Sequence, residues 1–161
     1  MGTSLRMRRV SPDEVAKGPD YLEKQFSKTL KNRTFKKELD SGILCNLGED
    51  WQMVNVLLTG EDFPATGVES LPVLGGEHIA TGGEQVDVLL VLKPELVRAA
   101  ADYLQGIDPG AQVRENKGKL RVVGGAPDWM IEALMGHLEA MKRFYLEASA
   151  SGGAVAKRVY S

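Results

Sequence analysis

The sequence of 161 residues predicts an α+β protein, in which a small mixed or antiparallel sheet packs against several helices. Residues 86–92 (VDVLLVL) form the clearest strand, and they are apolar on both faces, as expected of a central strand. A long amphipathic helix is predicted over residues 127–150, followed by a last strand at 154–160. Because the strands are scattered among more numerous helices, repeated right-handed crossovers are not expected.

The N-terminal part predicts one strand and two helices. Residues 4–10 (SLRMRRV) alternate roughly between apolar and basic, which is typical of a half-buried strand. Residues 11–14 (SPDE) are typical of a capped helix start, because the serine and the glutamate can exchange hydrogen bonds with the backbone. Asp20 can cap a second helix, whose shared face would carry Leu22, Phe26, Thr29 and Leu30.

The middle and C-terminal parts predict three helices and three strands around a long loop. Residues 51–58 are apolar nearly all round, which indicates a short buried helix that Thr59-Gly60 ends. Residues 61–83 are rich in Gly and Pro and have little periodicity, so a long loop is expected there. Residues 93–107 predict a helix, and residues 119–123 predict another strand. The face of the long helix is Met130, Leu134, Leu138, Met141, Tyr145 and Ala148.

Charge is distributed very unevenly along the chain. Residues 41–92 carry eight acidic side chains and no Lys or Arg, whereas residues 1–40 carry ten bases and six acids. We call residues 41–92 the base-free segment. A solvated acidic surface is its simplest interpretation, and docking of a basic protein or a cationic ligand is the functional one. A divalent cation site is less favoured, because the acids have no EF-hand spacing, and no metal site is predicted.

Composition excludes several classes of protein. The single cysteine, Cys45, excludes an internal disulfide, and no apolar run is long enough to cross a membrane. The basic helix faces lack interleaved aromatic residues, so no nucleic-acid binding is expected. The sequence therefore predicts a cytoplasmic monomer or small homo-oligomer without a cofactor.

One cluster of residues is a candidate site. Residues 74–83 (LGGEHIATGG) place Glu77 beside His78 between paired glycines. An acid and an imidazole in a pocket can do general acid–base chemistry, but a simple Gly-rich turn is the alternative. The other histidine, His137, borders the apolar stripe of the long helix and is interpreted as a hydrogen-bonded boundary residue. Cys45 is interpreted as a small buried hydrophobe.

Several short motifs occur in a characteristic order: Met1-Gly2, Trp51 followed by Leu58-Thr59-Gly60, PVLGG at 72–76, LKPELV at 92–97, and a late helix with Phe144-Tyr145 and Ala148. This order resembles the YfbM-like family, a bacterial domain of unknown function. The resemblance covers nearly the whole chain and implies a single domain over residues 1–161. It brings no established activity and no catalytic residues.

The matched positions within the base-free segment are candidate ligand-binding residues: Trp51, Thr59, Gly60, Gly75 and Gly76. The leading hypothesis is a binding or accessory protein that engages a basic protein partner or a cationic small ligand through residues 41–92. The alternative is a small pathway-specific enzyme, for example in natural-product biosynthesis, with a pocket around Trp51, Glu77 and His78. The lack of a recognisable nucleophile or metal set favours binding.

Overall fold

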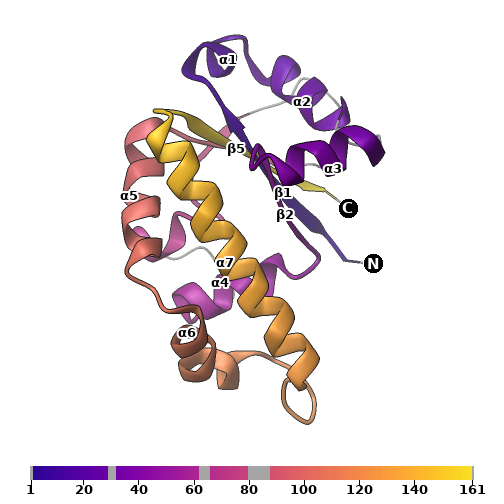
Figure 1. Cartoon of the computed structure of the whole chain (residues 1–161), viewed down its shortest axis with the longest axis vertical. Coiled ribbons are helices and arrows are strands. Elements are labelled where there is room, and N and C mark those ends of the chain that lie inside the picture. Colours follow the sequence, from indigo (N-terminus) through magenta and orange to yellow (C-terminus); the bar gives the residue numbers. More distant parts are fainter. Residues whose placement is uncertain (1, 29–31, 62–65, 80–87, 161) are drawn as a thin grey trace.

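A computed structural model describes residues 2–28, 32–61, 66–79 and 88–160. Its centre is a five-stranded sheet in which every neighbouring pair is antiparallel (Figure 1). The strand order is β2-β1-β5-β4-β3. The strands are β1 (Ser4–Val10), β2 (Leu44–Gly48), β3 (Glu77–Ile79), β4 (Val88–Leu92) and β5 (Ala154–Tyr160). The predicted α+β class is confirmed, and the sheet is antiparallel rather than mixed.

Helices cover both faces of the sheet. In Figure 1, α7 (Asp128–Ala150) crosses the front of the molecule, and α1, α2 and α3 group at the upper right. The larger helical layer consists of α7 with α4 (Trp51–Thr59), α5 (Pro94–Gln105) and α6 (Pro109–Asn116). The smaller layer consists of α1 (Pro12–Ala16), α2 (Pro19–Lys28) and α3 (Asn32–Asp40). None of the helices in the described ranges is long and apolar enough to cross a membrane.

The alternation of side chains along each strand divides the apolar residues into two cores. Leu5 and Met7 of β1 and Val155 of β5 enter the large core under α7. Val10, Ala154 and Ala156 point the other way and join a smaller core. There they meet α2 and the alternate residues of β4: Leu22, Phe26, Leu89 and Val91.

Arg6 and Arg8 of β1 lie on the face of the sheet that α2 and α3 cover, whereas Arg9 lies on the other face, 3.9 Å from Glu147 of α7. Arg8 pairs with Glu38 of α3, and Arg158 of β5 lies 3.3 Å from Glu23 of α2. The Arg6 guanidinium stacks over the Phe35 ring at 4.7 Å. The apolar–basic alternation of residues 4–10 is therefore that of a strand with a helical layer on each side.

Two local predictions are confirmed by the backbone hydrogen bonds. Ser11 and Glu14 form the expected capping box at the start of α1. The apolar run after Trp51 forms α4, and Gly60 ends this helix in the left-handed conformation, with φ at 77°. A residue with a side chain would be strained at this position.

Other predictions are wrong or incomplete. Residues 120–123 lie outside regular structure, and the 3-10 turn η2 (Lys117–Lys119) precedes them. The predicted strand does not form because Leu120 turns into the core, whereas Val123 is fully exposed and pairs with no strand. Asp108 does not simply follow α5: its side chain caps α6, a helix that was not predicted. The sequence patterns also do not predict helix α3 or the short strands β2 and β3.

The central position in the sheet belongs to β5, not to β4. Strand β4 is an inner strand, as its apolar character predicts, but it lies between β5 and the edge strand β3. Strand β5 carries a lysine and an arginine, which is unusual for the middle of a sheet. One of these two residues, Lys157, is also buried.

Lys157 is fully buried and holds the turn that follows the 3-10 segment η1 (Val68–Ser70). Its Nζ donates to the Leu71 carbonyl at 2.5 Å and to the Gly75 carbonyl at 2.7 Å. Burial lowers the pKa of Lys157 well below its usual 10.5. A neutral amine has two N–H donors, which is the number of carbonyls that it meets.

Tyr145 of α7 holds the same turn from a second side. Its hydroxyl, which is also fully buried, donates to the Pro72 carbonyl at 2.6 Å. We call Lys157, Tyr145 and residues 71–75 the clasp. A Cβ on Gly75 would lie 2.5 Å from the Leu71 Cα, so only glycine fits this turn. The clasp thus gives the PVLGG motif a structural role in the large core.

We expect Lys157→Met to flatten the dependence of stability on pH. Between the lowered pKa of the folded state and about 10.5, the unfolded chain binds more protons than the folded one, so the free energy of unfolding rises with pH. The slope approaches about 1.4 kcal/mol per pH unit for one proton. Urea unfolding between about pH 7 and 9.5 measures it.

Tyr145→Phe is the matched control for this variant. It removes one hydrogen bond to the same turn but keeps the buried amine. Its free energy of unfolding should therefore rise with pH at the same slope as that of the wild type. If the free energy of unfolding changed with pH in the same way for the wild type and Lys157→Met, Lys157 would be charged in the folded protein.

Cys45 of β2 should be inert in the folded protein. Its side chain is buried, and burial raises the pKa of the thiol to about 12, with a smaller opposing effect of Arg143. We expect an aromatic disulfide reagent at about pH 8 to leave the native protein unlabelled and to react at once in urea, because the thiolate is the reactive form. Rapid labelling of the native protein would contradict this burial.

Candidate functional site

Glu77 and His78 lie on the edge strand β3, and both are exposed. As neighbours on a strand, they project to opposite faces of the sheet. Glu77 Oε2 lies 3.7 Å from Lys93 Nζ. The structure therefore does not bring these two side chains together as an acid–base pair. A catalytic role for them stays a prediction.

The predicted ligand-binding residues of α4 have partners within the chain. The indole Nε1 of Trp51 donates to the carbonyl of Thr3 at 3.1 Å, which ties the N-terminal segment to α4. The Thr59 hydroxyl donates to the Asn55 carbonyl at 2.9 Å, at the other end of the helix. Trp51 and Thr59 are thus separated by the length of α4, roughly 12 Å.

Gly75 and Gly76 lie away from Trp51. Gly75 belongs to the clasp, and Gly76 has φ at +128°, where a Cβ would lie 3.0 Å from the Val91 carbonyl of β4. Trp51 follows β2, whereas Glu77 is on β3, and these strands are the two opposite edges of the sheet. The predicted site residues therefore form separate structural contacts, and their binding role remains a prediction.

A different acid and histidine come together. Asp50 Oδ2 lies 3.0 Å from Nε2 of His137, with 39% and 24% of their side chains exposed. Asp50 occupies the N-cap position of α4, yet its side chain makes no capping hydrogen bond and reaches α7 instead. The hydrogen bond predicted for His137 is confirmed. Its partner was not predictable, because the two residues lie 87 positions apart.

The structure divides the acids of the base-free segment into groups with different surroundings. Glu77 is near Lys93. Glu61 follows Gly60 in the sequence, and the Lys119 ammonium lies 2.8 Å from the position that a Cβ on Gly60 would occupy. Among the described residues, Glu49 and Asp50 form no ion pair with a Lys or Arg, and Glu49 is exposed. Asp62, Glu84 and Asp87 lie outside the described residues.

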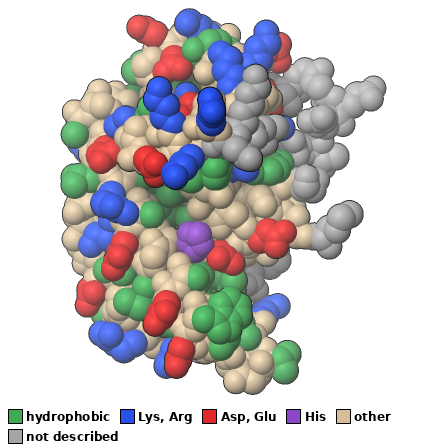
Figure 2. All heavy atoms as spheres, turned by 45° about the vertical axis from the view of Figure 1, so that its right-hand side comes forward, with side chains coloured by type: hydrophobic (Ala, Val, Ile, Leu, Met, Phe, Trp, Pro, Cys, Tyr) green, Lys and Arg blue, Asp and Glu red, His purple; other side chains and the backbone are tan. Residues whose placement is uncertain are grey.

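We call Glu49, Asp50 and His137 the acidic corner. It lies where the start of α4 meets α7, beside the half-buried Trp51. Figure 2 shows how charge is distributed on one face: acidic and hydrophobic side chains mix in its lower half, while the densest group of Lys and Arg lies in its upper half. The base-free segment is thus not one continuous acidic patch.

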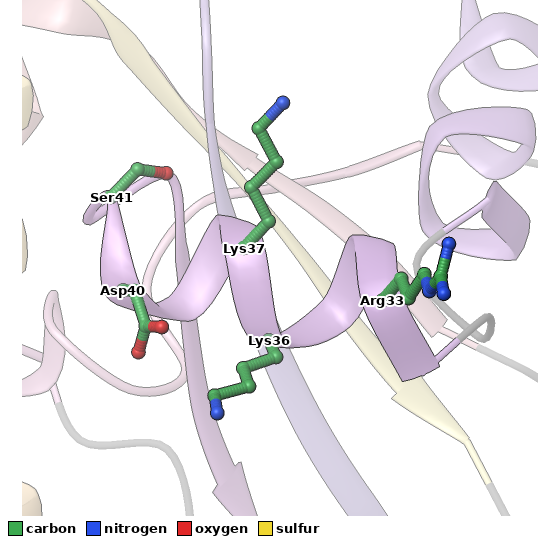
Figure 3. A pocket seen from close by; sticks show the side chains of 5 residues that line it. All are labelled: Arg33, Lys36, Lys37, Asp40 and Ser41. Atoms are coloured by element: carbon green, nitrogen blue, oxygen red, sulfur yellow. The ribbon is translucent and has the colours of Figure 1, made fainter.

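One hollow on the surface, of about 710 Å³, does not coincide with any predicted site residue. It lies beside α3 and is lined by Arg33, Lys36, Lys37, Asp40 and Ser41. Figure 3 shows these side chains pointing away from one another into solvent. This hollow therefore has no converging groups that could orient a substrate.

Two smaller hollows lie on either side of α7. One, about 380 Å³, separates α7 from the edge strand β2 and includes Asn46 and Arg143. The other, about 530 Å³, separates α7 from α5 and α6. Within the described part of the chain, no three His, Cys, Asp or Glu side chains come close enough to hold a metal ion.

The comparisons with known proteins agree with this architecture. The structure is similar to the crystal structure of YfbM from Escherichia coli, a protein of unknown function, with a TM-score of 0.61 and 15% sequence identity over 97% of this chain and 99% of that one. No curated protein matches the sequence. The family model described as domain of unknown function DUF1877 matches residues 1–156. The chain therefore belongs to the DUF1877 family, the YfbM-like family that its motifs resemble.

Proposed function

We propose that this protein is a binding module that engages a cationic group, on a basic protein partner or a small ligand, at the acidic corner. The observation that carries the proposal is the use of Asp50. Its carboxylate makes no capping hydrogen bond to α4 and meets the partly buried imidazole of His137 instead, while Glu49 beside it is exposed. Two adjacent carboxylates without a Lys or Arg partner among the described residues favour a positive group.

The surroundings support the same conclusion. The first part of α7, residues 128–141, adds three acids and no Lys or Arg. A local negative field of this kind raises the rate at which a positively charged partner arrives, and the effect weakens with salt. Trp51 adds a half-buried aromatic side chain next to the two acids.

The enzyme alternative has less support. General acid–base catalysis needs groups that converge on a concave site. Glu77 and His78 are exposed on opposite faces of β3, and the hollows described above are lined by other residues. Asp50 and His137 are the acid and imidazole that do meet, but no nucleophile lies beside them among the described contacts.

We expect the double variant Glu49→Gln/Asp50→Asn to lose a partner that the wild-type protein retains. The two charges supply the attraction, so retention should also fall between about 50 and 500 mM NaCl. The measurement is quantitative pull-down with the immobilised variants, followed by titration of the purified partner. A basic protein among the salt-sensitive partners would show that the cationic group belongs to a protein. A small amine that shifts the backbone amide signals of residues 49–51 would show that it belongs to a small ligand.

Glu61→Gln and Glu77→Gln are matched controls. Glu77 lies beside Lys93, and Glu61 follows Gly60 at the other end of α4. Both acids lie outside the acidic corner, so partner retention should stay at the wild-type level. Equal losses for the controls and the double variant would show a diffuse charge effect and would contradict a site at the acidic corner.

A further inference from the structure

One edge of the sheet has backbone groups that point away from it. Strand β2 is an edge strand, and β1 is its neighbour in the sheet. The Arg9 N–H donates to the Ile43 carbonyl at 2.8 Å, so this carbonyl points towards β1. Because bonded and non-bonded pairs alternate along an antiparallel ladder, Cys45 also bonds to β1, whereas the N–H and C=O groups of Leu44 and Asn46 point away from the sheet. Within the described part of the chain, these outward groups have no hydrogen-bond partner.

Strand β2 also lacks the features that protect an edge. Edge strands are commonly protected from pairing with another chain by charged side chains, by proline or by being very short. The sequence of β2 is LCNLG, without a charged residue or a proline. The opposite edge, β3, is only three residues long and carries the exposed Glu77 and His78. The register of β2 shifts near Gly48, but residues 44–46 stay regular and are open to one more strand.

The hollow of about 380 Å³ between α7 and β2 gives such a strand room, and we call it the β2 groove. Residues 44–46 line it along the free edge. Ala140 and Phe144 of α7 contribute one wall, and residues 39–42, at the end of α3 and in the turn after it, contribute the other. An extended peptide in the groove would bond to β2 through its backbone and place alternate side chains against the two walls.

A guanidinium lies beside the middle of this edge. Arg143 of α7 lines the β2 groove, is exposed, and forms no ion pair with any residue that the structure describes. Burial raises the pKa of the Cys45 thiol, and the nearby Arg143 opposes this effect. Since Cys45 is the middle residue of the stretch 44–46, Arg143 is placed to meet a side chain in the middle of an added strand.

The surroundings of the groove carry an excess of positive charge. The hollow beside α3 shares Asp40 and Ser41 with the β2 groove, so the two adjoin. Three cations line that neighbouring hollow and extend into solvent (Figure 3): Arg33, Lys36 and Lys37. The acids of the groove itself are Asp40 and Glu147, and Glu147 lies 3.9 Å from Arg9. The field of these cations favours the approach of an acidic partner.

We propose that the β2 groove binds an extended, acidic peptide segment of a partner protein, which adds to the sheet as a strand beside β2. A carboxylate side chain in the middle of the segment meets Arg143, because a guanidinium can hold a carboxylate by two parallel hydrogen bonds. A second copy of the chain fits less well. Two β2 strands that paired about a two-fold axis would bring their Arg143 side chains together. The groove is separate from the acidic corner, which attracts a positive group.

Arrays of nine-residue synthetic peptides test the class of ligand. Peptides with Glu in the centre and varied flanking residues should be retained in preference to the same peptides with Gln or Lys there. Arg143→Gln should weaken the best Glu peptide about tenfold and leave its Gln counterpart little changed. Arg98→Gln is the control, since it removes an equal charge from an exposed position on α5. No preference for Glu, or equal losses in the two variants, would overturn the proposal.

Amide hydrogen exchange of the complex with the best Glu peptide tests the added strand. The N–H groups of Leu44 and Asn46 should exchange about tenfold more slowly when the peptide is bound, because each gains a hydrogen bond. The Cys45 N–H, which faces β1, should change little. Equal slowing at all three residues, or slowing at β3 instead, would contradict pairing with β2. Slow exchange of Leu44 and Asn46 in a peptide-free dimer would show that a second copy occupies the edge.

Discussion

The structure depends most on the burial of Lys157 in the middle strand of the sheet. An uncompensated ammonium in the large core would cost on the order of several kcal/mol. Burial accordingly lowers the pKa of Lys157, and its Nζ donates to two backbone carbonyls. Those carbonyls belong to a turn that would otherwise have buried, unsatisfied oxygen atoms. The lysine and the turn therefore satisfy each other, and Tyr145 fixes the turn to α7 as well.

Strand β5, which carries Lys157, also brings the two ends of the chain together. Strand β1 pairs with β5 along its whole length, from Ser4 opposite Tyr160 to Val10 opposite Ala154. The central strand β5 follows all the other described elements in the sequence, and the clasp that it completes begins some eighty residues earlier. The fold is held by contacts between distant parts of the sequence, which are costly to close and cooperative once formed.

Local structure accounts for most residues of the family motifs. Gly60 ends α4, Thr59 caps its last turn, Trp51 secures the N-terminal segment, and Gly75 closes the clasp. The acidic corner is built on this frame, since α4 presents Glu49 and Asp50 at the point where α7 supplies His137. Asp50 joins α4 to α7 through His137, and among the described residues neither Glu49 nor Asp50 has a Lys or Arg partner, whereas Glu77 lies beside Lys93.

Four features are predictable from the sequence alone: the fold class, the capping box at Ser11, the buried α4 helix with its glycine stop, and the long C-terminal helix with its last strand. These features depend on periodicity and on turn chemistry within a few residues. The central place of β5, the burial of Lys157 and the contact of Asp50 with His137 become visible only once the chain is folded. Each of these depends on which distant segments pair, and a lysine in an alternating strand looks the same in sequence whether it faces solvent or carbonyl oxygens.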